Sequence, residues 1–145
     1  MVRPASNISN DPANAQAIET SVPVFHCPAA VEPPNLTTYL AITGPDACLL
    51  PRETRRLAEI TDSHGSTLMV IEAGVANAVP WMAPADAGES LMMSLGPTTK
   101  LHHAGGTNAC LVDGHVQFLK ASTPATVRRA LMSMAGDDNK FAVEW

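Results

Sequence analysis

Proline is distributed along this chain in a way that restricts its fold more than any other feature. Twelve of the 145 residues are proline, and nine more are glycine. Proline fixes φ and lacks a backbone N–H, so an interior proline interrupts a helix or a sheet ladder. We therefore expect short elements joined by many turns, and a bundle of long helices is disfavoured.

The composition is that of one globular domain. Hydrophobic residues make up 46% of the chain and charged residues 16%, and 145 residues suffice for one modest core. The formal net charge of −5 argues against nucleic acid as a partner. No stretch of 18 apolar residues and no signal peptide is visible, so the chain as given is expected to be soluble. Its three cysteines, Cys27, Cys48 and Cys110, have no CxxC spacing and allow at most one internal disulfide.

Two strands are predicted in the first half of the chain. Residues 36–43, LTTYLAIT, form a β-branched and aromatic run that ends at the turn signal Gly44-Pro45. Residues 67–72, TLMVIE, predict a second, buried strand.

The segments around the second strand are predicted to be less regular. Residues 52–60 predict a turn or two of helix with Leu57 and Ile60 facing inward. Residues 73–100 contain three prolines and three glycines, so we expect a loop-rich segment laid over the sheet.

Asp113-Gly114 predicts a β-hairpin near the C-terminus. The strands are residues 107–112 and 115–119, and a two-residue type I′ connection would place Val112 opposite His115. In that register one face belongs to the core. It consists of Ala109, Leu111, Val116 and Phe118.

A last amphipathic helix is predicted to cover the sheet. Thr123 is its expected N-cap and Pro124 its first residue, with Arg128 and Arg129 on the solvent side. The expected inward residues are Val127, Ala130, Leu131 and Met134. Strands and helices do not alternate as βαβ units, so the predicted class is α+β with an antiparallel sheet. Residues 1–21 are interpreted as a flexible lead-in or truncated helix end, and 22–145 as the domain.

Several polar residues invite a chemical interpretation. His102, His103, Asp113 and His115 lie within 14 residues, but no HExxH-type spacing is present and Asp113 is explained by turn chemistry. We assign no catalytic residue, no metal and no cofactor. A metal-dependent enzyme or metal-binding module that uses His103, Asp113, His115 and Glu72 stays as the alternative.

His103 is expected to be a structural histidine whose ring bonds backbone groups of Gly105-Gly106, and His102 is expected to be exposed. Glu72 ends a hydrophobic strand, where it is either solvated or buried and paired to His103 or to backbone amides.

The turn 62–67 is expected to be polar and non-catalytic. Ser66 lacks the G-x-S-x-G context of a nucleophile, and Asp62 is expected to cap the turn amides. Gly105-Gly106 lacks the lysine and the following helix of a phosphate loop. A third possibility is a calcium-stabilised loop with oxygen ligands from Asp62, Asp86 and Glu72.

The stretch HAGGTNACLVDGHVQFL begins at His103 and leaves nine residues between that histidine and Asp113-Gly114. It resembles the prepilin-type H-X9-DG signature of a large bacterial family, domain of unknown function family 1559. Other segments similar to that family are FHCPA (25–29), TTYLAITGP (37–45), AEITDSHGSTLMVIEAG (58–74), VPWMAPAD (79–86) and RRALMSMAGDD (128–138). The signature residues carried over are His103, Gly105, Gly106, Asn108, Asp113 and Gly114.

The resemblance implies a type IV pilin-like or pseudopilin-like globular domain without catalytic activity. It implies an exported structural or assembly subunit of a type II secretion or type IV pilus-like system, at the cell envelope or its extracellular side. Its partners would be other pilin-like subunits or the secretion machinery. The N-terminal helix that anchors such proteins in the membrane is absent from this sequence through truncation, a miscalled start or loss. Ser63-His64-Gly65 and His115 depart from the family pattern.

We interpret the H-X9-DG element as a structural latch. Asp113-Gly114 would fix the hairpin register, and His103 would fold back to hydrogen-bond Glu72 or the turn at Asp62.

Overall fold

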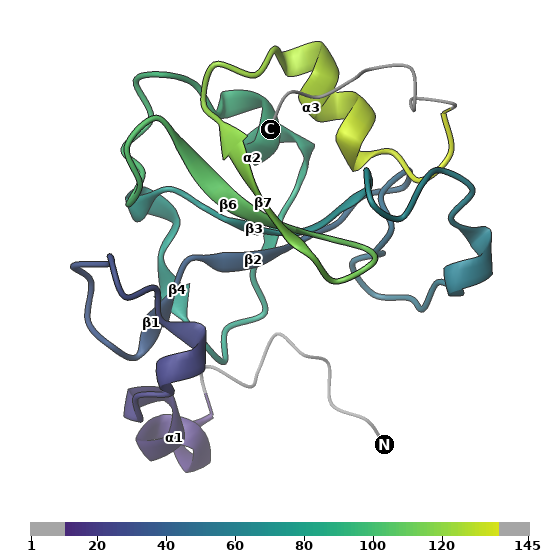
Figure 1. Ribbon diagram of the computed structural model, residues 1–145. Helices are drawn as coiled ribbons and strands as arrows, with labels where there is room; N and C mark the ends of the chain where they lie inside the picture. The colour runs from purple at the N-terminus through teal and green to yellow at the C-terminus, as the bar shows by residue number, and fades with distance from the viewer. Residues whose placement is uncertain (1–10, 137–145) are drawn as a thin grey trace.

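The computed structural model describes residues 11–136, which form a mixed α+β fold (Figure 1). The strands are β1 (Leu36–Thr37), β2 (Tyr39–Ile42), β3 (Leu68–Glu72), β4 (Val79–Pro80), β5 (Asp86–Ala87), β6 (Gly106–Leu111) and β7 (Val116–Lys120). The helices are α1 (Ala15–Glu19), α2 (Glu89–Ser94) and α3 (Ala125–Met132), and single 3-10 turns lie at Pro12–Asn14, Pro23–Phe25, Leu57–Glu59 and Val75–Asn77. Residues 1–10 of the predicted lead-in and 137–138 of the last family-like segment lie outside the described residues.

The main sheet has five strands in the order β5-β2-β3-β6-β7. The four strands from β2 to β7 are antiparallel, as predicted, but β5 pairs parallel to β2. After β3 the chain passes the end of β2 and comes back along its far side. β5 therefore runs opposite to β3 and in the same direction as β2, so the sheet is mixed rather than purely antiparallel.

The predicted strand 36–43 is two strands. Leu36–Thr37 pairs with β4 in a separate two-stranded sheet, and the main-sheet strand begins at Tyr39. The Tyr39 amide donates to Thr37 Oγ1 at 3.0 Å, a local bond that replaces a ladder bond at the break. The prediction of strand 67–72 is confirmed, because β3 spans Leu68–Glu72.

The hairpin is present, but its register differs by one residue from the prediction. Cys110 lies opposite Val116, and the Leu111 amide donates to the His115 carbonyl. The connection therefore has three residues, 112–114, and Gly114 takes the left-handed φ of 90°. The slip turns β7 over, so Leu119 is buried while Val116 and Phe118, predicted for the core, are 62% and 37% exposed.

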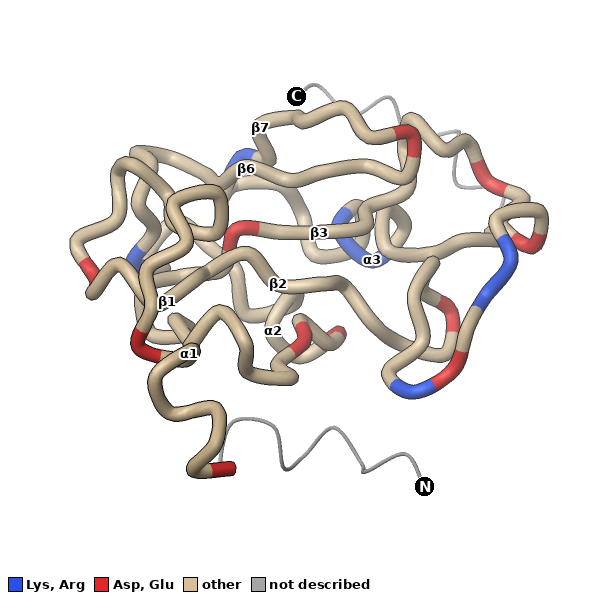
Figure 2. The backbone as a smooth tube through the Cα atoms, turned by 90° about the horizontal axis from the view of Figure 1, so that it is seen from below, with Lys and Arg blue, Asp and Glu red and all other residues tan. Residues whose placement is uncertain are grey.

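The two faces of the sheet differ in cover. α2 and α3 lie on one side of it (Figure 1), over a core that includes Leu40, Ile71, Ala109, Met92 and Leu131. The other side, which we call the open face, carries residues in register across four strands. They are Ala41, Val70, Cys110 and Val116, with Phe118 two residues beyond. Figure 2 shows that acidic and basic residues are rare along these strands and gather mainly in the connections.

The last helix runs over 125–132, and one of its arginines was assigned wrongly. Arg129 is exposed, as predicted, but Arg128 is only 5% exposed. Its guanidinium donates to the carbonyls of Met92 and Met93 at 2.9 and 3.2 Å and to that of Thr123. Arg128 thus caps the C-terminal carbonyls of α2, which a short helix leaves without partners of its own.

The segment after α3 ties together distant parts of the chain. The Met134 carbonyl accepts hydrogen bonds from the Thr61 and Asp62 amides, and the Met134 amide donates to the Asp46 carbonyl. The Gly136 amide donates to both carboxylate oxygens of Asp62 at 3.1 and 3.0 Å. Asp62, predicted to cap the amides of its own turn, thus holds the exit of the last helix.

Two predictions for the connections need correction. Ile60 is buried as expected, but Leu57 is 60% exposed because its segment makes only a single 3-10 turn. The segment 73–100, predicted as loop, contains β4, β5 and helix α2, whose Met92 is fully buried. Within residues 11–136, no helix has the length and apolar character needed to cross a bilayer.

Candidate functional site

Three side chains from distant parts of the chain meet at one end of the open face. Glu72 ends β3, His103 precedes β6, and Cys27 belongs to the loop that covers this end of the sheet. His103 Nε2 lies 3.1 Å from Glu72 Oε2 and 3.6 Å from Cys27 Sγ. Cys27 and Glu72 are 3% and 2% exposed, whereas the His103 side chain is 30% exposed. We call this the Cys27–Glu72–His103 cluster.

Local structure fixes each member of the cluster. Gly105 takes a φ of 82°, and His103 forms an isolated antiparallel bridge with Gly106. The bridge is a backbone pairing; the His103 ring, which was predicted to bond backbone groups of Gly105-Gly106, instead faces the side chains of Glu72, Asn108 and Cys27. The strand register places Glu72 beside Asn108, whose amide nitrogen lies 3.1 Å from both Glu72 Oε2 and His103 Nε2.

The hydrogen bonding of the cluster is unbalanced. One imidazole nitrogen can point a single proton or a single lone pair, yet His103 Nε2 faces a carboxylate, an amide nitrogen and a sulfur. If Nε2 carries a proton, it can donate to Glu72, but its N–H then points at the N–H of the Asn108 amide. If Nε2 carries no proton, it can accept from Asn108, but its lone pair then faces the Glu72 carboxylate. In addition, Glu72 Oε1 is buried without a hydrogen-bond partner. Such an orphaned buried oxygen is costly.

Burial and negative charge keep protons on the neighbouring acids. Burial, with a further contribution from the Glu72 side chain, raises the pKa of the Cys27 thiol. Burial also raises the pKa of Tyr39 to about 12, with Cys27 and Glu72 adding electrostatically. With no cation bound nearby, Cys27 is therefore a thiol at neutral pH, and a thiol is a poor nucleophile.

A second acid–histidine pair lies next to the cluster in sequence. His102 Nε2 is 3.6 Å from Glu32 Oε2, and their side chains are 2% and 11% exposed. The side chain of His102 is thus buried next to Glu32, contrary to the prediction that His102 is exposed. Neither Glu32 oxygen has a hydrogen-bond partner. This corner of the molecule therefore gathers two buried carboxylates with unsatisfied oxygens.

The structure separates the residues of the predicted metal alternative. Asp113 Oδ1 contacts His115 Nδ1 at 2.5 Å at the hairpin tip, and the His115 amide, followed by its side chain, lowers the pKa of Asp113. His103 lies at the other end of β6, and the five steps between the six residues of that strand, at about 3.3 Å each, put the two ends roughly 17 Å apart. His103, Asp113 and His115 therefore do not form one site.

The other predicted groups stay apart as well. Within residues 11–136, the Cys27–Glu72–His103 cluster is the one group of three or more His, Cys, Asp and Glu side chains close enough to share a metal ion, so Asp62 and Asp86 do not join Glu72. Ser66 Oγ donates to the Ser63 carbonyl within its own turn. Of the cluster, Cys27 was missed, because nothing local in the sequence connects it to residues 45 and 76 positions away.

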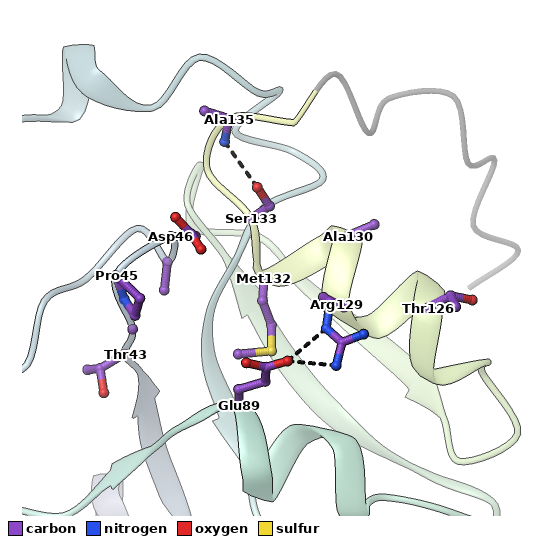
Figure 3. Close-up of a pocket in the computed structure, with 12 residues that line it drawn as sticks. Thr43, Pro45, Asp46, Glu89, Thr126, Arg129, Ala130, Met132, Ser133 and Ala135 are labelled. Atoms are coloured by element: carbon purple, nitrogen blue, oxygen red, sulfur yellow. Dashed lines mark hydrogen bonds and ion pairs between the residues drawn. The ribbon is translucent and has the colours of Figure 1, made fainter.

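A separate pocket of about 600 Å³ lies between the loop 43–47, α2 and α3 (Figure 3). Glu89 and Arg129 form an ion pair along its wall, and Ser133 Oγ accepts from the Ala135 amide. Its lining contains neither histidine nor cysteine.

The chain was compared with known proteins at the levels of sequence and structure. No family model, no curated protein and no solved structure matches it. Its function must therefore be argued from its own residues.

Proposed function

We propose that this protein is a non-catalytic structural or assembly subunit of a pilin-like or pseudopilin-like system, as the H-X9-DG resemblance implies. The observation that carries the proposal is what the signature residues do. They hold the sheet together rather than line a cavity.

Both ends of the signature attach to the neighbouring strand β3. At the tip, the Val112 amide donates to the Thr67 carbonyl at 2.9 Å and the Asp113 amide to the His64 carbonyl at 3.3 Å, just before β3 begins. At the other end, His103 pairs with Glu72, the last residue of β3. A latch at each end of one strand is a structural function, and it accounts for the spacing between the histidine and the Asp-Gly pair.

The surroundings of the cluster support the absence of catalysis. Cys27 has a raised pKa, so it is a thiol at neutral pH and a poor nucleophile. The open face supports an assembly role, because Val116 and Phe118 present apolar surface there and no helix within residues 11–136 covers them. Contiguous apolar patches on a protein surface often mark contacts with another protein.

The test is the location and processing of the full gene product in its native host. The DNA upstream of Met1, read in frame, is expected to encode a basic leader and an apolar helix. An antibody against the purified chain is expected to detect it in the membrane fraction and in sheared surface filaments. A protein confined to the cytosol, with no such upstream segment, contradicts the proposal.

A further inference from the structure

The Cys27–Glu72–His103 cluster has the ligand types of a transition-metal site. A thiolate, an imidazole nitrogen and a carboxylate oxygen are the usual ligands of zinc in proteins. The three ligand atoms all lie within 4.8 Å of one another. They come from a loop, a strand end and a bridge, so the fold itself brings them together.

The distances suit one ion held between these atoms. A tetrahedral zinc with bonds of about 2.3 Å to sulfur and 2.0–2.1 Å to nitrogen separates those two ligands by about 3.6 Å. Cys27 Sγ and His103 Nε2 are 3.6 Å apart. The 3.1 Å from His103 Nε2 to Glu72 Oε2 is close to the roughly 3.3 Å that the same geometry gives for nitrogen and oxygen.

The unsatisfied Glu72 carboxylate is a second indication of a bound cation, independent of those distances. Glu72 is 2% exposed and its Oε1 has no hydrogen-bond partner. Buried carboxylates are stable when they are paired or bind a metal. A divalent ion would supply the missing charge and end the conflict at His103 Nε2, where a lone pair would then bind the metal.

We propose that Cys27 Sγ, His103 Nε2 and a carboxylate oxygen of Glu72 form a binding site for Zn²⁺. The fourth ligand is a water molecule on the partly exposed side of the His103 ring. Asn108 donates to the Glu72 carboxylate and orients it, as outer-shell groups do around metal ligands. Binding displaces the Cys27 proton, because the thiolate is the ligand.

The proposal goes beyond the assembly role, and its test is independent of that role. The full chain, without an affinity tag and in a non-thiol reductant, is stripped with a chelator and titrated with Zn²⁺. One equivalent is expected to remain after gel filtration and to raise the melting temperature by several degrees. The Co²⁺ form is expected to show the visible bands of tetrahedral cobalt and a thiolate-to-cobalt charge-transfer band.

Variants assign the ligands. Loss of an outer-shell partner weakens metal binding 10- to 100-fold, so Cys27→Ser and His103→Gln are each expected to weaken it by at least about 100-fold. Cys110→Ser and His115→Gln are the matched controls, since both residues lie outside the cluster, and they are expected to bind as the parent does. A parent that retains no zinc, or a Cys27→Ser variant that binds as tightly as the parent, overturns the site.

A measurement on the unsubstituted protein covers the case in which a variant does not fold. Zn²⁺ is expected to slow alkylation of Cys27 by a maleimide at least about tenfold, as read by mass spectrometry of peptides, because the metal occupies the thiolate. Cys110, which lies outside the cluster, serves as the internal control. Equal alkylation of Cys27 with and without Zn²⁺ overturns the proposal.

Discussion

Replacing Gly106 with alanine tests whether the first residue of β6 must be glycine. A Cβ at this position would lie 2.4 Å from the Leu119 carbonyl oxygen and 2.7 and 2.9 Å from two ring carbons of Phe118. The Phe118 ring can rotate away. The Leu119 carbonyl belongs to the β6–β7 ladder, in which Gly106 lies opposite Lys120, so it can move only if the end of the hairpin opens.

The cost follows from these contacts. Overpacking by one methyl group costs about 1–3 kcal/mol, and each ladder hydrogen bond lost adds about 1 kcal/mol. We expect Gly106→Ala to lower the free energy of unfolding by about 3–4 kcal/mol. For a domain of this size that corresponds to a drop of roughly 10 °C in the melting temperature.

Alanine variants of two other glycines serve as controls in thermal and urea melts. They distinguish the steric clash at Gly106 from the general effect of replacing glycine with alanine. Gly88 has a φ of −81°, and a Cβ added there would meet nothing within 4 Å, so Gly88→Ala is expected to melt within about 2 °C of the parent. Gly105 also has open space but a φ of 82°, so Gly105→Ala is expected to cost only the strain of about 1–2 kcal/mol. Adding Phe118→Ala to Gly106→Ala is expected to restore a minor part of the loss. If Gly106→Ala melts like Gly88→Ala, the backbone clash is not real.

Three further predictions concern the core, the faces of the sheet and pH. Arg128→Met is expected to destabilise by about 2–4 kcal/mol in urea melts, because buried carbonyls of α2 lose a charged donor, whereas the exposed Arg129→Met should change stability by less than about 0.5 kcal/mol. Leu119→Ala is expected to cost about 2–5 kcal/mol and Val116→Ala less than about 0.5 kcal/mol; the opposite order would restore the predicted hairpin register. Burial raises the pKa of Tyr39 to about 12, above the value near 10 of the unfolded chain, so the folded state holds this proton more tightly and stability falls as the pH rises from 10 to 12. Tyr39→Phe is expected to flatten that decline in melts across the same pH range, and an unchanged slope would contradict the assignment.

Local signals predicted the parts of the fold that depend on neighbours in sequence. The β-branched run before Glu72, the Asp-Gly turn and the helix after Pro124 are all present. The hairpin register was wrong because Asp113-Gly114 is compatible with both a two-residue and a three-residue connection. Deciding between them requires knowing which residues of β7 face α2 and α3, and that depends on packing across the sheet.

The part of the site that depends on local sequence could be predicted, and the part that depends on packing between distant segments could not. A carboxylate at the end of a hydrophobic strand must be solvated or paired, and the pairing of Glu72 with His103 is the alternative that the structure contains. Cys27 joins them through a loop with no periodic pattern, so its position could not be derived from spacing. Arg128 was placed in solvent by its charge, since helical periodicity does not reveal that the carbonyl end of α2 lies beside it.

The bonds around Met134 bear on how the chain folds during synthesis. Asp62 and Thr61 are held by residues 134 and 136, more than 70 positions later in the chain. At roughly 5–20 residues per second on the ribosome, those partners follow several seconds after Asp62. The segment between β2 and β3 must stay open for that time, and closing so long a loop late is typical of slow folding. A nascent chain arrested before residue 134 should therefore be protease-sensitive around Thr61, and sensitivity there should disappear when the remaining residues are released.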